Sequence, residues 1–177
     1  MAFQKFLVLW ILFAIPTAWS QQMTFKDGKT AAAAAPWRFL CENYALTGHA
    51  DIQVARADKG GWLKIEVDTT DPSFYIGGVT YVYLEDQTVL VCTDKGMREN
   101  INGKAAAWYV FTAAEMERLK KTDIQSIRFN IRGTASKFSS QTGNFTAVNK
   151  KRYFNLRGVG PSTYDTAKAI TQMYPST

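Results

Sequence analysis

The residue types that most often perform catalysis are scarce in this chain. His49 is the only histidine, so any Ser-His-Asp or Cys-His mechanism must use it. No G-x-S-x-G motif accompanies it, and the glycine pairs show none of the spacings that bind phosphate. Carboxylate pairs occur at Glu66/Asp68 and Glu85/Asp86, where the pattern indicates a strand face and a turn open to solvent. The sequence therefore favours a protein without catalytic residues. A hydrolase is the alternative, and it requires His49 or paired carboxylates to converge in a cleft.

The two cysteines, Cys41 and Cys92, are the candidates for one disulfide. A bridge would close a loop of about 50 residues and stabilise the fold by roughly 4 kcal/mol in the chain-entropy model. The alternative is two buried thiols that act as small hydrophobic side chains. One histidine and two separated thiols do not make a metal-ligand set, and no cofactor motif is present, so we expect neither a metal nor a cofactor.

Aromatic residues next to cations offer the strongest indication of a binding surface. Such side chains can stack on sugars or other flat ligands. The alternation around Trp62 places it on the polar face of its strand, and Trp108 and Tyr109 point to opposite sides, so that one of them could be exposed. The alternative is that another layer of the fold covers these rings. The candidate ligand-binding residues are Trp62, Trp108, Arg128 and Arg132.

The first twenty residues have the pattern of a secretory signal peptide. Lys5 precedes the apolar run 6–15, and the small residues Ala18 and Ser20 stand at the −3 and −1 positions of a cut before Gln21. The run is too short to cross a bilayer, which takes roughly 20 apolar residues. We therefore expect residues 1–20 to be removed and the mature chain to be periplasmic or secreted. No other segment is apolar enough to make it an integral membrane protein.

The formal net charge of +6 is concentrated in the second half of the chain. Between Arg118 and Arg157 there are ten basic residues, and Asp123 is the only acid. A basic face can attract anionic polysaccharide, lipid headgroups or nucleic acid. The export signal argues against nucleic acid. The alternative is a solvated surface that keeps an exported protein soluble.

Alternating apolar and polar residues predict a domain built mostly of strands over 37–175. Residues 21–36 show no clear period and include five consecutive alanines, so we expect a flexible linker there. Asp58-Lys59-Gly60-Gly61 predicts a tight hairpin between two strands. The predicted strands begin at Trp37, Asp51, Leu63, Phe74, Thr88, Ala105, Ile124 and Arg152.

Two helices are expected among these strands. Thr112 and Glu115 form a capping box, which predicts a short helix from there to about Lys121. A final helix should begin at Ser162 or Thr163. The stretches 94–104 and 133–151 are polar and are expected to be loops. The fold class is mainly β (β-rich α+β): an antiparallel sheet forming a small sandwich or open barrel, with one inserted and one C-terminal helix.

Two pairs of segments in the middle third of the chain stand out: 83–89 followed by 92–96, and 111–116 followed by 124–129. On these segments the chain resembles small exported proteins of Bacteroidota-type bacteria. The motifs are structural, and the resemblance implies a bacterial periplasmic or secreted setting without naming an activity.

These observations predict an exported, non-catalytic binding or structural protein that acts on an envelope or extracellular protein or a glycan. The alternative is a periplasmic carrier of a small apolar ligand, which requires a hollow barrel. The sequence leaves the oligomeric state open.

Overall fold

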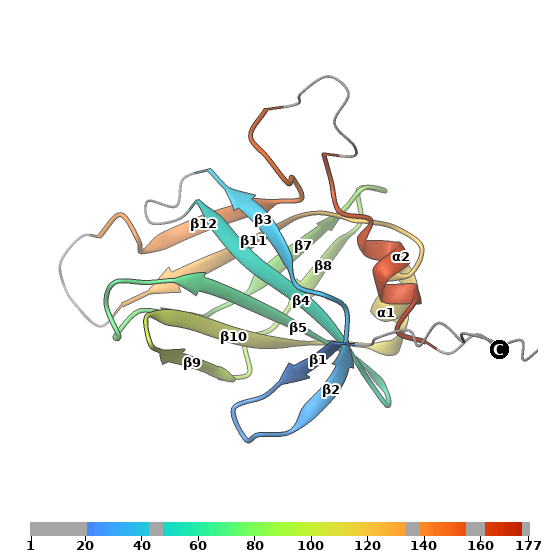
Figure 1. The fold of residues 1–177 in the computed structure, drawn as a ribbon, viewed down its shortest axis with the longest axis horizontal. Coiled ribbons are helices and arrows are strands. Elements are labelled where there is room, and N and C mark those ends of the chain that lie inside the picture. Colours follow the sequence, from blue (N-terminus) through green and yellow to red (C-terminus); the bar gives the residue numbers. More distant parts are fainter. Residues whose placement is uncertain (1–20, 43–47, 134–138, 155–161, 175–177) are drawn as a thin grey trace, which may run out of the picture.

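The computed structural model describes residues 21–42, 48–133, 139–154 and 162–174, and its main feature is one antiparallel sheet. The sheet curls into a half-barrel (Figure 1), with strand order β8-β7-β11-β12-β3-β4-β5-β10-β9. The mainly β, antiparallel fold predicted from the sequence is thereby confirmed. The strands are β1 (Gln21–Thr24), β2 (Thr30–Ala33), β3 (Trp37–Cys41), β4 (His49–Ala57), β5 (Gly60–Asp68), β6 (Tyr75–Ile76), β7 (Thr80–Leu84), β8 (Val89–Cys92), β9 (Arg98–Ile101), β10 (Lys104–Phe111), β11 (Ile124–Arg132) and β12 (Gly143–Val148).

The β4–β5 hairpin forms where the paired glycines predict it. Asp58 and Lys59 make the turn, and Gly60 follows with φ of +137°. A Cβ atom at Gly60 would come within 2.1 Å of the Phe111 carbonyl oxygen, so this position requires glycine both for its conformation and for the close approach of β10.

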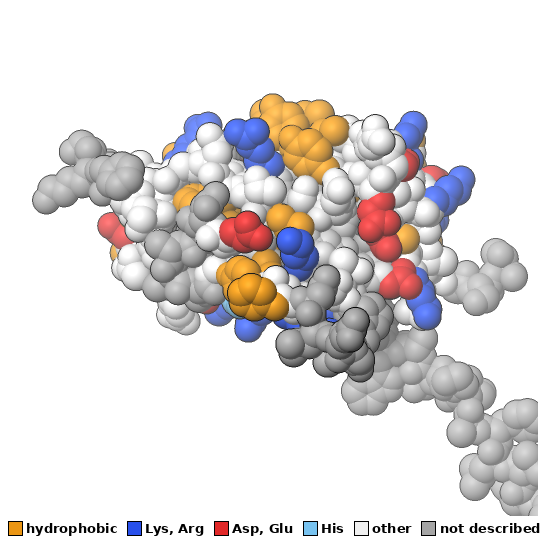
Figure 2. Space-filling model, turned by 90° about the horizontal axis from the view of Figure 1, so that it is seen from above, with side chains coloured by type: hydrophobic (Ala, Val, Ile, Leu, Met, Phe, Trp, Pro, Cys, Tyr) orange, Lys and Arg blue, Asp and Glu red, His pale blue; other side chains and the backbone are white. Residues whose placement is uncertain are grey.

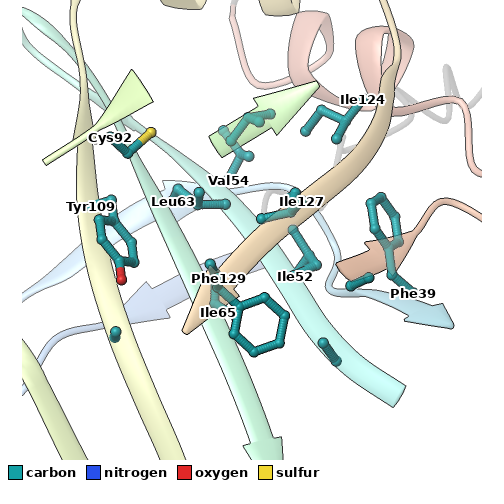
Figure 3. Close-up of a cluster of buried hydrophobic side chains, with 14 of the residues drawn as sticks. Phe39, Ile52, Val54, Leu63, Ile65, Cys92, Tyr109, Ile124, Ile127 and Phe129 are labelled. Carbon is teal, nitrogen blue, oxygen red and sulfur yellow. The ribbon is translucent and has the colours of Figure 1, made fainter. Parts of the chain in front are cut away.

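The hydrophobic core fills the concave side of the half-barrel. Inward-facing residues of neighbouring strands meet there (Figure 3), because the period of two sends every second side chain to this face. The fully buried aromatic residues Phe39, Tyr109 and Phe129 lie among aliphatic side chains such as Ile52 and Leu63. Burial raises the pKa of Tyr109 to about 12, and its hydroxyl donates a 3.4 Å hydrogen bond to the carbonyl of Gly78. This bond joins β10 to the turn before β7.

Cys41 and Cys92 are both buried in this core as thiols, so the expected disulfide is not formed. The reason is strand order. Cys41 lies on β3 and Cys92 on β8, and three other strands separate β3 from β8 in the sheet. Burial raises the pKa of the Cys92 thiol to about 12, which keeps it protonated and unreactive at neutral pH.

Two short helices, α1 (Ala113–Leu119) and α2 (Thr166–Thr171), pack side by side at one end of the half-barrel (Figure 1). The predicted capping box is present, because Thr112 Oγ1 accepts from the amide of Glu115 at 3.3 Å while the Glu115 carboxylate accepts from the amide of Thr112 at 2.7 Å. The final helix begins later than predicted. Asp165 caps it by accepting from the amide of Lys168, and neither Ser162 nor Thr163 does so.

Residues 21–33 are a hairpin, so the prediction of a flexible linker is wrong for them. β1 and β2 pair in register from Gln21↔Ala33 to Thr24↔Thr30, and β2 continues onto β4 at Ala33↔Ala55. Met23 is fully buried beneath the hairpin. The alanine run conceals this hairpin in the sequence. Consecutive alanines show no alternation between apolar and polar residues, which is the usual sign of a strand.

Two predicted loops also contain strands. β9 occupies part of 94–104 and β12 part of 133–151, and each pairs with a strongly apolar neighbour, β10 and β11. Each of these strands has mostly polar or small side chains, with Ile101 in β9 and Phe145 and Val148 in β12 as the exceptions, so the sequence of either strand alone carries only a weak strand signal. Residues 152–154 are not in a strand, and 155–156 lie outside the described residues, as does the expected signal peptide.

Candidate functional site

Two of the residues singled out in the sequence, Trp62 and Trp108, lie close together on the convex side of the sheet. In the β5–β10 pairing, Trp62 stands opposite Val110 and Trp108 opposite Lys64, so the two indoles are diagonal neighbours on one face. Trp62 is half-buried and Trp108 is buried. Neither Trp108 nor Tyr109 is exposed, which agrees with the alternative that another layer covers these rings: the hairpin covers Trp108, and the main core contains Tyr109.

The β1–β2 hairpin is the layer that covers this face. Phe25, just after β1, meets Trp62 edge-on with ring centroids 5.1 Å apart, and it lies 6.5 Å from Trp108. Beneath the hairpin, Met23 and Ala33 pack on residues of β4 and β10 in a second apolar cluster, apart from the main core. Phe25 is not among the candidate residues predicted from the sequence, because it lies in the stretch 21–36 that was expected to be a linker.

The base of the hairpin is fixed by two hydrogen bonds to β4. The amide of Ala34 donates to the carbonyl of Val54 at 2.9 Å, and Nε2 of Gln53 donates to the carbonyl of Ala34 at 3.0 Å. Gln53 is itself buried, so this second bond satisfies a polar side chain in an apolar setting. The hairpin is thus held firmly at one end while its tip stands away from the sheet.

A groove of about 990 Å³ lies between the tip of the hairpin and the sheet. The hairpin residues 25–32 form one wall, the β4–β5 turn and the β8–β9 loop form the others, and Trp62 and Trp108 line the base. Its charged residues are four cations and two acids, Lys26, Lys29, Arg56, Arg98, Asp27 and Asp58. Asp27 forms a 2.8 Å ion pair with Lys29. The groove therefore combines aromatic surface with a positive balance of charge.

Arg98 is held in the wall of the groove by Asp94. One oxygen of Asp94 accepts from Arg98 Nη1 at 3.1 Å and from the amide of Gly78 at 2.7 Å, and the other accepts from the amide of Gly96 at 2.6 Å. Partial burial alone would raise the pKa of Asp94, but these amides and the nearby arginines outweigh it and lower the pKa. The Arg98 guanidinium also lies 4.4 Å from the centroid of the Tyr75 ring.

Arg56, on the other side of the groove, is positioned by the C-terminal end of α2. Its Nη1 donates to the carbonyl of Met173 at 3.4 Å, and its guanidinium lies 5.5 Å from the ring centroid of Tyr174. Both arginines are thus oriented by neighbours, with part of their donor capacity left for a ligand.

The buried indole of Trp108 contributes an unsatisfied donor at the base of the groove. Its Nε1 has no hydrogen-bond partner among the described residues. Leaving such a buried donor unpaired costs about 1–3 kcal/mol. A ligand oxygen that reached Trp108 after a small adjustment of the hairpin would recover part of that cost.

Arg128 and Arg132 lie elsewhere on the sheet. Both are exposed on β11, and β12, β3 and β4 separate β11 from the strand that carries Trp62. Arg128 stands opposite Tyr81 of β7, and Arg132 donates to Oδ1 of Asn130 at 3.1 Å. The structure thus brings the two tryptophans together but does not join them to the two arginines. The order of strands, which decides this, is not readable from the spacing of the residues.

A second, smaller hollow of about 300 Å³ gathers the residues that a hydrolase would need. His49, Asp51, Glu66 and Asp68 line it together with Arg38 and Lys104. Ion pairs join its acids to these cations and to Lys64: Arg38 Nε to Asp51 at 3.0 Å, Lys64 Nζ to Glu66 at 2.7 Å, and Lys104 Nζ to Glu66 at 2.9 Å and Asp68 at 3.3 Å.

The charge network in this hollow suits it poorly to acid–base catalysis. Burial alone would raise the pKa of Glu66, but hydrogen bonds and charges from Lys64 and Lys104 outweigh it and lower the pKa. A general acid at neutral pH requires a raised pKa. Among the described residues, no serine, threonine or cysteine lines the hollow to act as a nucleophile. We therefore interpret these ion pairs as structural contacts between neighbouring strands and not as a catalytic site.

Within the described residues, no three His, Cys, Asp or Glu side chains come together in a way that could bind a metal ion. No helix in that part of the chain is both long enough and apolar enough to span a bilayer. No protein-family model, curated protein or solved structure matches the chain.

Proposed function

We propose that this is an exported, non-catalytic binding protein whose groove beneath the β1–β2 hairpin takes an oligosaccharide bearing carboxylate groups. The observation that carries the proposal is the half-buried Trp62 ring in a groove walled by oriented arginines. The apolar face of a sugar ring stacks on an indole, and a carboxylate accepts paired hydrogen bonds from a guanidinium. The volume falls in the range of small-molecule sites, roughly 300–1,000 Å³.

The groove favours this ligand over a purely apolar one. A carrier of a small apolar molecule would bury it inside the barrel, whereas this groove lies on the convex side and has four cations against two acids. An apolar ligand would offer no partner to the four cations, while an anionic ligand can pair with them.

Isothermal titration with an oligosaccharide of uronic acids and a neutral oligosaccharide of equal length tests the proposal. We expect the acidic ligand to bind more tightly and its affinity to fall as salt is raised. Trp62→Ala should weaken binding about tenfold or more, equivalent to about 1.4 kcal/mol. Lys26→Gln should weaken it by a smaller factor, because the cation lies at the edge of the groove.

Arg128→Gln is the matched control, since Arg128 is an exposed cation on β11, outside the groove. Its affinity should equal that of the wild type. Equal losses in Arg128→Gln and Lys26→Gln would show that net charge alone attracts the ligand and would contradict the groove as its site. Binding of an apolar ligand in preference to the acidic sugar would favour the carrier function instead.

Export is part of the proposal. Cleavage after Ser20 would leave every described element in the mature chain, because β1 begins at Gln21. The N-terminal sequence of the protein recovered from the periplasm or the medium should begin at or next to Gln21. Recovery of the uncleaved chain from the cytoplasm would contradict it.

A further inference from the structure

The β7–β8 ribbon presents an apolar face that the groove does not use. Among the described residues, eight large hydrophobic side chains are exposed; three of them lie on this ribbon and a fourth lies next to it. Val89 and Val91 are 42% and 55% exposed on β8, while Val79 and Tyr81 are 44% and 38% exposed beside and on β7. Tyr81 stands directly opposite Val91 in the pairing, so these side chains form one surface.

The outer strand of this ribbon also lacks the residues that ordinarily protect a sheet edge. β8 is the last strand of the sheet path, and the stretch 88–93 contains no charged residue and no proline. Edge strands are ordinarily protected by lysines, prolines or bulges. Figure 2 shows one face of the molecule, on which charged side chains are interspersed with apolar patches.

The charges at the two ends of the ribbon have opposite signs. Glu85 and Asp86 are exposed in the turn between β7 and β8, with Arg118 of α1 near Asp86.

Beyond the other end of the ribbon, Lys95 is exposed and Arg132 reaches toward Gly78. Asp94 at that end is already bonded to Arg98 and to backbone amides. The ribbon is therefore acidic at its turn and basic at its open end.

We infer that the apolar face of the β7–β8 ribbon binds the same face of a second copy of this chain, with the two ribbons antiparallel across a twofold axis. In that arrangement each acidic turn meets the basic open end of the partner, and the valines and Tyr81 meet at the centre. A parallel arrangement would place like charges together at both ends. A twofold interface is self-complementary by necessity, and this ribbon has that property.

Sedimentation equilibrium of the mature protein measures the association directly. We expect a dimer whose dissociation constant lies in the micromolar range, because the patch is small. Val91→Lys should raise that constant at least tenfold by placing a charge in the apolar centre. Ile101→Lys is the matched control: Ile101 is 56% exposed on β9, also at a sheet edge but outside the ribbon. This variant should dimerise like the wild type.

A charge exchange tests the antiparallel orientation. Glu85→Lys and Lys95→Glu should each weaken the dimer several-fold, and the double variant should recover most of the loss. Thermal unfolding of each variant confirms that it is folded. The inference is overturned if the wild type stays monomeric up to about 1 mM, if Ile101→Lys and Val91→Lys dissociate equally, or if the double variant is weaker than either single one.

Discussion

Met23 is the side chain through which the β1–β2 hairpin packs most deeply on the sheet, so its truncation should detach the hairpin. Met23 is fully buried, yet it belongs to the small cluster under the hairpin and not to the main core. Truncating a buried methionine to alanine costs about 2–5 kcal/mol. The rest of the attachment consists of the pairing of Ala33 with Ala55, the two hydrogen bonds of Ala34, and the contacts of Phe25 and the small alanines with the sheet. We therefore expect Met23→Ala to release the hairpin without unfolding the half-barrel.

The size of the effect can be stated for hydrogen exchange. A loss of about 2 kcal/mol multiplies the population with the hairpin open about thirtyfold. Deuterium uptake of a peptide covering 21–34 should rise accordingly, while β11 keeps its protection. Emission of Trp62 and Trp108 should shift to longer wavelength, because opening exposes both rings to water.

Met116→Ala is the matched control for this experiment. Met116 is 2% exposed and lies in the main core, where α1 packs on the sheet. The same truncation there should lower the unfolding temperature of the whole domain. It should not raise the deuterium uptake of 21–34 more than that of the other strands. If Met23→Ala left the exchange of 21–34 unchanged, or loosened all strands equally, the idea of a locally attached hairpin would be refuted.

Two further outcomes follow from the buried polar groups. Asp94 has a lowered pKa in the folded state, so its contribution to stability is present above about pH 4, the unfolded value, and is lost as the pH falls further. Asp94→Ala should therefore destabilise the protein at pH 7 by about 2 kcal/mol and much less near pH 2, as measured by urea unfolding. Cys41 and Cys92 should both react with a thiol reagent in the unfolded, unreduced protein, whereas Cys92 should not react in the folded one; an unfolded chain with no reactive thiol would contradict the structure.

The local parts of the fold were predictable because their signals are local. The β4–β5 turn follows from Gly60 and Gly61, and the start of α1 follows from the capping box of Thr112 and Glu115. Each of these features depends on a few adjacent residues, whose conformational preferences act over short distances.

The positions of strands relative to one another were not predictable in this way. Sequence spacing places Cys41 and Cys92 inside strands, and the structure agrees, but the separation of β3 from β8 is a property of the whole sheet. For the same reason, the sequence could not predict that the four candidate binding residues lie in two separate places. Trp62 and Trp108 lie on strands that are neighbours in the sheet, while Arg128 and Arg132 lie on β11.

The composition of the alanine run wrongly suggested a flexible linker, and the structure shows what these alanines do. Ala31 and Ala33 belong to the second apolar cluster, where the hairpin faces Ala55 of β4 and Ala106 of β10. Small side chains on both surfaces allow the hairpin to approach the sheet closely, while Phe25 near its tip packs on Trp62 and keeps that end raised. Larger residues in the run would lift the base of the hairpin and widen the groove along its whole length. The alanines thus set the distance between the aromatic base of the groove and its upper wall, and with it the thickness of any ligand that can contact both.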